Sequence, residues 1–109
     1  MSNKLKIESA TLDNSFEIYV ETPGYAREDI SVELTNKEFD LLGVGVLVDV
    51  PCLVISAENE RRGKRGVLIR LDYGTKANYK EITSSVENGL LTISVPKSKK
   101  YTNRTIPVM

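Results

Sequence analysis

The residue types that most often carry out chemistry in proteins are scarce in this sequence. The 109-residue chain contains no histidine and a single cysteine, Cys52. Without histidine, the usual general base and the commonest metal ligand are missing, and a cysteine nucleophile lacks the partner that would activate it. Because Cys52 precedes the apolar residues Leu53 and Val54, we expect a small buried side chain there and not a reactive thiol.

The remaining candidates for chemistry are weak as well. The segment Gly43-Val44-Gly45 lacks the third glycine and the following helix of a dinucleotide-binding loop. Asp49 lies within an apolar run, where exposure on a strand edge explains it better than acid–base catalysis does. A basic cluster lacks interleaved aromatic residues, which favours a solvated loop over a nucleic-acid patch. That cluster comprises Arg61, Arg62, Lys64 and Arg65. We therefore predict no enzyme, no cofactor and no metal site.

Charge and hydropathy narrow the classes of partner. Lysine plus arginine total 15 and aspartate plus glutamate total 15, so the formal net charge is zero. A chain without net charge does not attract nucleic acid or an anionic membrane through a strong electrostatic field, and it is prone to self-association. A lone cysteine suits the reducing cytoplasm. Because no apolar run approaches about 18 residues and the first eight residues are polar, we expect neither a membrane span nor a secretory signal.

The elements that position these residues are strands, because apolar and polar residues alternate along much of the chain. Phe16, Ile18 and Val20, for example, share one face of a predicted strand. Asn88-Gly89 separates two alternating runs and predicts a tight hairpin turn. The expected strands cover residues 5–8, 15–21, 30–35, 41–50, 53–57, 67–71, 82–86 and 91–95. Short, evenly spaced strands without a helical period predict an all-β, antiparallel sandwich.

Several segments together resemble the small heat-shock proteins, whose core is the alpha-crystallin domain. They include a Pro23-Gly24 turn, a Gly66 to Arg70 strand, the Asn88-Gly89 hairpin and a terminal Ile106-Pro107-Val108. Similar segments occur at 28–32 and 53–58, and all six follow the order found in that family. The resemblance implies an immunoglobulin-like β-sandwich over residues 9–97. A short arm or first strand would occupy 1–8 and a flexible extension 98–109.

The resemblance also implies a function, namely an ATP-independent holdase that binds unfolding client proteins and assembles with copies of itself. In the family, the tail motif of one subunit enters a groove on another. Pro107 favours an extended backbone, in which Ile106 and Val108 point the same way about 7 Å apart. Arg70 would form an ion pair at the dimer interface. The predicted groove for the tail or for a client is lined by Ile30, Val32, Leu34, Ile82, Ser84 and Val86.

The sequence departs from the family pattern in several places. The signature alanine is Ser84, only residues 1–7 stand in for the usual N-terminal arm, and residues 38–52 form an insertion where a tight turn is usual. The insertion either pairs with another subunit or lies over the sandwich, or it forms a longer internal hairpin packed on its own core. Its candidate interface residues are Leu41, Leu42, Val44, Val46 and Val48.

Two other functions fit the same fold. A co-chaperone or scaffold domain would dock one partner instead of holding many clients, and the short arm favours it. A structural β-domain would assemble through its strand edges into a larger particle. The Ile106-Pro107-Val108 tail favours the holdase over both.

Overall fold

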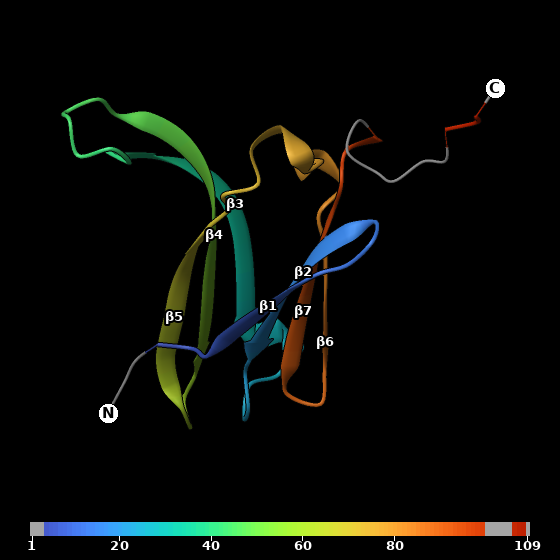
Figure 1. The fold of residues 1–109 in the computed structure, drawn as a ribbon. Coiled ribbons are helices and arrows are strands. Elements are labelled where there is room, and N and C mark those ends of the chain that lie inside the picture. Colours follow the sequence, from blue (N-terminus) through green and yellow to red (C-terminus); the bar gives the residue numbers. More distant parts are fainter. Residues whose placement is uncertain (1–3, 100–105, 109) are drawn as a thin grey trace. The chain divides into compact units, whose positions relative to one another are not determined.

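The computed structural model describes residues 4–99 and 106–108 and contains seven strands in two antiparallel sheets (Figure 1). The chain forms two compact units, each built around one sheet. The all-β prediction is confirmed, and two antiparallel sheets are consistent with the predicted β-sandwich. The strands are β1 (Ile7–Thr11), β2 (Ser15–Glu21), β3 (Ile30–Phe39), β4 (Val48–Asn59), β5 (Gly63–Arg70), β6 (Thr83–Glu87) and β7 (Leu90–Pro96). Three short 3-10 turns cover Arg27–Asp29, Gly74–Lys76 and Tyr79–Glu81.

The four-stranded sheet has the order β1-β2-β7-β6 and follows the predicted alternation closely. In β2, Phe16, Ile18 and Val20 are buried and their neighbours are not. Ile18 lies opposite Ile93 of β7, so the two central strands bury matching rows of side chains. The ring of Phe16 also stacks on that of Tyr73, with centroids 3.9 Å apart.

The β6–β7 hairpin turns at the predicted dipeptide. Asn88 and Gly89 have φ values of 52° and 78°, as a tight turn between right-handed twisted strands requires. The register continues from Glu87 opposite Leu90 to Thr83 opposite Ser94. This hairpin prediction is confirmed in position and in conformation.

The first strand lies further along the chain than predicted. The expected strand at 5–8 was wrong in its bounds, since β1 covers Ile7–Thr11. This strand therefore includes residues on both sides of the boundary predicted between the short arm, 1–8, and the sandwich, 9–97. The turn fixes this register, because the backbone N–H of Leu12 donates to the Ser15 carbonyl at 2.8 Å. Leu5 is instead buried beside β5, where its N–H donates to the Gly66 carbonyl at 3.4 Å.

The three-stranded sheet has the order β3-β4-β5, and its central strand passes through Pro51. The predicted break there was wrong. Proline lacks a donor and is tolerated where a strand has few ladder partners. The pairing with β5 ends at Cys52 opposite Arg70, so Pro51 lies beyond it and only its carbonyl is used, accepting from the Leu71 N–H at 2.8 Å.

The connection from β4 to β5 is tighter than the solvated loop predicted at the basic cluster, since β5 already begins at Gly63. Asn59 lies opposite Gly63, and its side-chain oxygen accepts from the Arg62 N–H at 2.6 Å. The Asn59 amide nitrogen donates to the Gly24 carbonyl at 2.9 Å, and the Tyr25 hydroxyl donates to that of Gly63 at 3.0 Å. These contacts tie the turn to the Pro23-Gly24 segment and leave no long loop between the strands.

Candidate functional site

The tail motif presents two large aliphatic side chains to solvent. Ile106 is 73% exposed and Val108 is 99% exposed. Residues 100–105, which join the motif to the rest of the chain, lie outside the described residues. Two exposed aliphatic side chains flanking a proline are available for docking on an apolar surface.

The first half of the predicted groove lies on β3, an edge strand of the three-stranded sheet. Ile30, Val32 and Leu34 lie opposite Ala57, Ile55 and Leu53, which are fully buried residues of β4. Ile30 and Val32 are half-buried, whereas Leu34 is exposed. This row therefore leaves apolar surface uncovered at the edge of a packed sheet.

The second half of the predicted groove lies on or beside β6, an edge strand of the other sheet. Ile82 precedes the strand and is half-buried, as is Val86. Ser84 is exposed and lies opposite Ile93. The two predicted rows thus occupy edge strands of different sheets, and their common groove stays a prediction.

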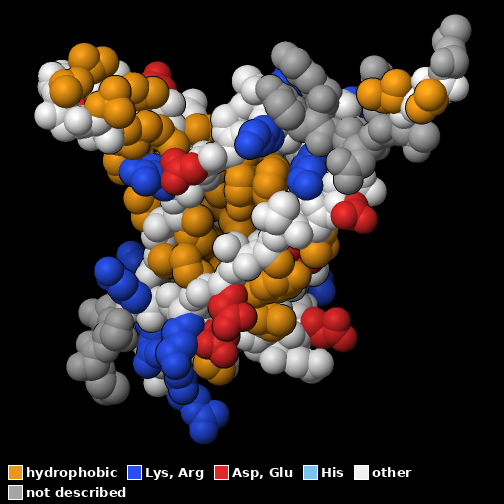
Figure 2. Space-filling view, in the orientation of Figure 1, with side chains coloured by type: hydrophobic (Ala, Val, Ile, Leu, Met, Phe, Trp, Pro, Cys, Tyr) orange, Lys and Arg blue, Asp and Glu red, His pale blue; other side chains and the backbone are white. Residues whose placement is uncertain are grey.

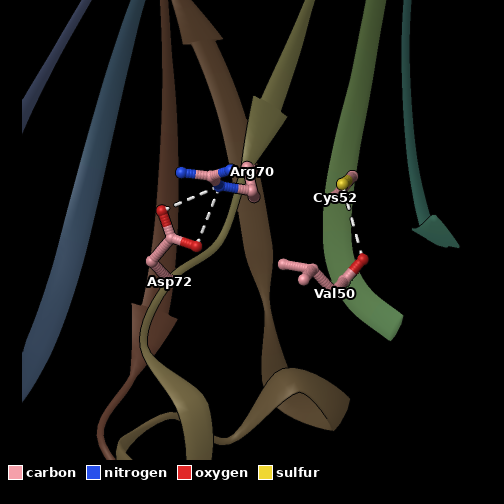
Figure 3. Close-up of polar contacts among 4 residues, drawn as sticks. All are labelled: Val50, Cys52, Arg70 and Asp72. Atoms are coloured by element: carbon pink, nitrogen blue, oxygen red, sulfur yellow. Dashed lines mark hydrogen bonds and ion pairs between the residues drawn. The ribbon is translucent and has the colours of Figure 1, made fainter. Parts of the chain in front are cut away.

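Arg70, the predicted interface residue, forms an ion pair within its own chain (Figure 3). Its Nε lies 3.0 Å and 3.1 Å from the two carboxylate oxygens of Asp72, and both side chains are about half exposed. Asp72 lies two residues after Arg70, the last residue of β5, so the sequence spacing could have suggested this partner. The interface role of Arg70 stays a prediction.

Arg70 also reaches toward the β3–β4 hairpin, which sequence reasoning missed. Its guanidinium carbon lies 5.4 Å from the centroid of the Phe39 ring, within the range of a cation–π contact. Arg70 and Phe39 belong to the two outer strands, and directly paired residues share a sheet face. The pair therefore bridges β4 on the face that carries Val50 and Cys52, both of which are buried.

Cys52 is a structural side chain, as predicted. It is fully buried, and its Sγ lies 3.4 Å from the Val50 carbonyl oxygen (Figure 3). Among the described residues, no group of three or more Asp, Glu, Cys or His residues could hold a metal ion.

On the surface, Tyr19 donates to the Glu17 carboxylate at 2.8 Å, and this hydrogen bond raises the pKa of the Tyr19 phenol.

The insertion is the distal end of the β3–β4 hairpin. Glu38 lies opposite Asp49 and Phe39 opposite Val48, and a loop over 40–47 closes the hairpin beyond the end of β5 (Figure 1). The prediction of a longer internal hairpin is confirmed. Packing on its own core, or over the sandwich, was wrong, because the aliphatic residues of the loop are exposed. Those are Leu41, Leu42, Val44, Val46 and Leu47, with Val48 beside them.

The exposed loop has a defined backbone. One carboxylate oxygen of Asp40 accepts from the Val44 N–H at 3.1 Å, and the other accepts from the Gly45 N–H at 2.8 Å. Gly43 and Gly45 have φ values of 69° and 83°, which glycine adopts without strain. Figure 2 shows the result as a cluster of hydrophobic side chains at the end of the hairpin. We call this surface, residues 41, 42, 44, 46 and 47, the hairpin tip.

Comparison with known proteins finds one family model. The model described as "Hsp20/alpha crystallin family" matches residues 8–109. A comparison with curated protein sequences finds no match. Within the described part of the chain, no helix is long and apolar enough to cross a membrane.

Solved structures show the same fold. Heat shock protein 16.0 from Schizosaccharomyces pombe has 23% identity and a TM-score of 0.63, with 100% of this chain and 98% of that chain covered. HSP18.5 from E. histolytica has 12% identity and a TM-score of 0.68, covering 96% and 98%. A small heat-shock protein from Xylella fastidiosa, reported to have a distinct high-order structure, has 24% identity and a TM-score of 0.62, covering 96% and 95%.

Proposed function

The chain belongs to the Hsp20/alpha crystallin family, and we propose that it acts as an ATP-independent holdase. It would bind unfolding proteins through apolar surface, prevent their aggregation and assemble with copies of itself. The observation that carries this proposal is the family match over residues 8–109, which includes the exposed Ile106-Pro107-Val108 tail. Holding a client requires no bond to be made or broken. The cytoplasmic location and the absence of nucleic-acid and membrane partners stay predictions.

The tail supplies the reversible contact in this proposal. Ile106 and Val108 are already exposed, so docking costs no rearrangement of a packed core. Burying both side chains contributes about 3–5 kcal/mol at most, and ordering the tail offsets part of that. One such contact is weak and exchanges readily, whereas many contacts within one particle hold it together.

The β3 edge is one half of the receptor that we propose. Leu34 is exposed beside the half-buried Val32, which gives an apolar row at a strand edge. An edge strand also offers backbone donors and acceptors that an extended segment can pair with. A tail and an unfolded client share these properties, so both would compete for this edge and for the row on β6.

Arg70 has a place in the proposal as a residue of the dimer interface. Within the chain, Asp72 and Phe39 hold its guanidinium in one orientation. A group that is already oriented loses less conformational freedom when it meets a partner. Replacing Arg70 with alanine is therefore expected to weaken the dimer, and an unchanged dimer mass would count against this role.

The proposal is tested by changing the tail and measuring particle mass. Replacing Ile106 and Val108 together by serine removes both aliphatic side chains and leaves Pro107 in place. Native mass spectrometry should then show smaller particles than the unaltered chain forms. The matched control replaces Leu12, which is exposed in the β1–β2 turn, with serine and should leave the mass unchanged.

Three results would speak against the proposal. If removing residues 105–109 changed neither particle mass nor client protection, the tail would have no role in holding. A monomer that binds a single partner would instead indicate the scaffold alternative. A particle that assembles fully but protects no client would indicate a structural domain.

A further inference from the structure

The hairpin tip exposes five aliphatic side chains at one end of the three-stranded sheet, and the same unit carries a groove. Leu42 is 83% exposed, and its neighbours in the loop are exposed as well. The groove has a volume of about 560 Å³ and lies along β4 and β5, with Val54, Gly66 and Leu68 among its lining residues. Leu68 is exposed there. An apolar protrusion and an apolar recess thus occur on one sheet.

The groove is shaped by a missing side chain. Gly66 lies opposite Ser56, between the rows of Val54–Leu68 and Glu58–Lys64. An added Cβ at Gly66 would lie 3.1 Å from the Ile55 carbonyl oxygen, so the strands are close at that point. The recess therefore follows from the glycine, and it is bordered by the larger side chains of Val54 and Leu68.

The two lysines that line the groove are opposite in sign to the carboxylates at the base of the hairpin tip, and Glu58 lies directly opposite one of them, Lys64. Lys4 and Lys64 both line the groove. At the base of the hairpin tip, Glu38 lies directly opposite Asp49, and both carboxylates are exposed. Like charges directly across a strand pair are destabilising, and nearby lysines of another surface would relieve that repulsion.

The hairpin tip cannot reach the groove of its own chain. Val48 and Ser56 belong to the same continuous strand, β4, and a strand rises about 3.3 Å per residue, so these positions lie about 26 Å apart. Bringing them together would break the ladders with β3 and β5. Only a second molecule can place a hairpin tip in the groove.

We propose that the hairpin tip of one chain docks in the β4–β5 groove of a second copy. Leu42 and Val44 would contact Val54 and Leu68, and the Glu38–Asp49 pair would face Lys4 and Lys64. The contact joins two different surfaces, so it is heterologous, and repeated copies form a ring or an open chain. It extends the self-association in the proposed function and uses neither the tail nor the row of Ile30, Val32 and Leu34 on β3.

Disulfide trapping between two single-site variants tests this arrangement. Val44→Cys places a thiol on the tip, and Leu68→Cys places one at the groove, on a chain lengthened by a peptide tag so that products differ in mass. Cys52 is fully buried and stays unreactive. After mixing and mild oxidation, we expect a mixed disulfide between the two chains as the main product.

The controls separate the alternatives. Leu12→Cys replaces Leu68→Cys in a parallel mixture, because Leu12 is exposed in a turn of the other sheet, and should give little mixed product. A product that joins only Val44→Cys chains to one another would show tip-to-tip contact and overturn the proposal. Absence of any disulfide beyond the Leu12→Cys level would overturn it as well.

Charge exchange gives a second, independent readout. Lys64→Glu should lower particle mass, and Asp49→Lys added to it should restore that mass. Failure of the second substitution to restore any mass would contradict the pairing. Client protection by the unaltered chain is measured separately, so a defect there counts against the holdase proposal and not against this contact.

Discussion

Two of the hairpins in this molecule, β6–β7 and β3–β4, end in opposite ways. In the β6–β7 hairpin, the strands close at Asn88-Gly89, and Leu91, Ile93 and Val95 of β7 are almost completely buried. In the β3–β4 hairpin, the loop over 40–47 is equally apolar, yet its aliphatic side chains are exposed. Hydropathy alone therefore does not decide burial in this protein.

The difference arises from what lies beside each strand. Strand β7 is central, with β2 on one side and β6 on the other. Strand β4 is also central where β5 accompanies it, and there Leu53 and Ile55 are buried. Beyond Cys52 only β3 remains as a neighbour, and Arg70 and Phe39 bridge the last buried residues. Past that point the hairpin has no third strand to cover it.

The largest expected effect distinguishes the buried side chains of β7 from the exposed side chains of the hairpin tip. Ile93→Ala removes a fully buried side chain of β7 and should lower the free energy of unfolding by about 2–5 kcal/mol. Leu42→Ala at the hairpin tip should change it by less than about 0.5 kcal/mol. Urea denaturation followed by circular dichroism measures both. Equal losses in the two variants would mean that the tip is packed in the folded chain.

The second prediction concerns the turn of the β6–β7 hairpin. Gly89 has a φ of 78°, and a side chain in that conformation costs about 1–2 kcal/mol. Gly89→Ala should therefore destabilise the fold by roughly that amount. Asn88→Gly is the matched control, because glycine adopts positive φ freely. It should leave the midpoint of urea denaturation nearly unchanged. A neutral Gly89→Ala would show that the turn relaxes without cost.

A smaller effect is expected from the loop of the β3–β4 hairpin. Asp40→Ala removes the two hydrogen bonds to the Val44 and Gly45 amides. Since the site is exposed, stability should fall by only about 0.5–1 kcal/mol, but hydrogen exchange at those two amides should become faster. Asp49→Ala, which removes a nearby exposed carboxylate, should leave both exchange rates as they were. If hydrogen exchange at those amides were unchanged after Asp40→Ala, the hydrogen bonds from Asp40 would not be what orders the hairpin tip.

A similarly small effect is expected where β5 ends and the β3–β4 hairpin continues without a third strand. Arg70→Lys keeps the charge but loses the planar group that lies over Phe39, which is worth about 0.5–1 kcal/mol at an exposed site. A double-mutant cycle with Phe39→Leu isolates this contact from the ion pair with Asp72. A coupling energy of zero would mean that the contact between the guanidinium and the ring does not stabilise the fold.

The sequence predicted the elements that follow a local rule. Alternation located the buried faces of β2 and β7, and Asn88-Gly89 located the turn between β6 and β7. Prediction from the sequence failed where residues far apart in the chain decide the structure. Pro51 continues β4 because β5 has already ended there, and Leu5 is buried beside β5 instead of starting β1. The apolar run at the hairpin tip has no period, so nothing local could tell a covered strand from an exposed loop.

The candidate site also has one part that the sequence predicts and other parts that it does not. The exposed tail motif could be recognised from its residues alone. The contact between Arg70 and Phe39 could not, because those residues meet only when β3 and β5 lie on either side of β4. Likewise, the groove at Gly66 depends on which side chains flank a glycine across two strands.

The central claim is that this chain holds unfolding proteins without nucleotide. It is tested most directly by heating a client protein that aggregates, in the absence of ATP, and following light scattering with increasing amounts of the chain. We predict that scattering is suppressed in proportion to the chain added, and that the Ile106→Ser/Val108→Ser variant suppresses it to a different extent from the Leu12→Ser control. Scattering that is the same with and without an excess of the chain would contradict the account.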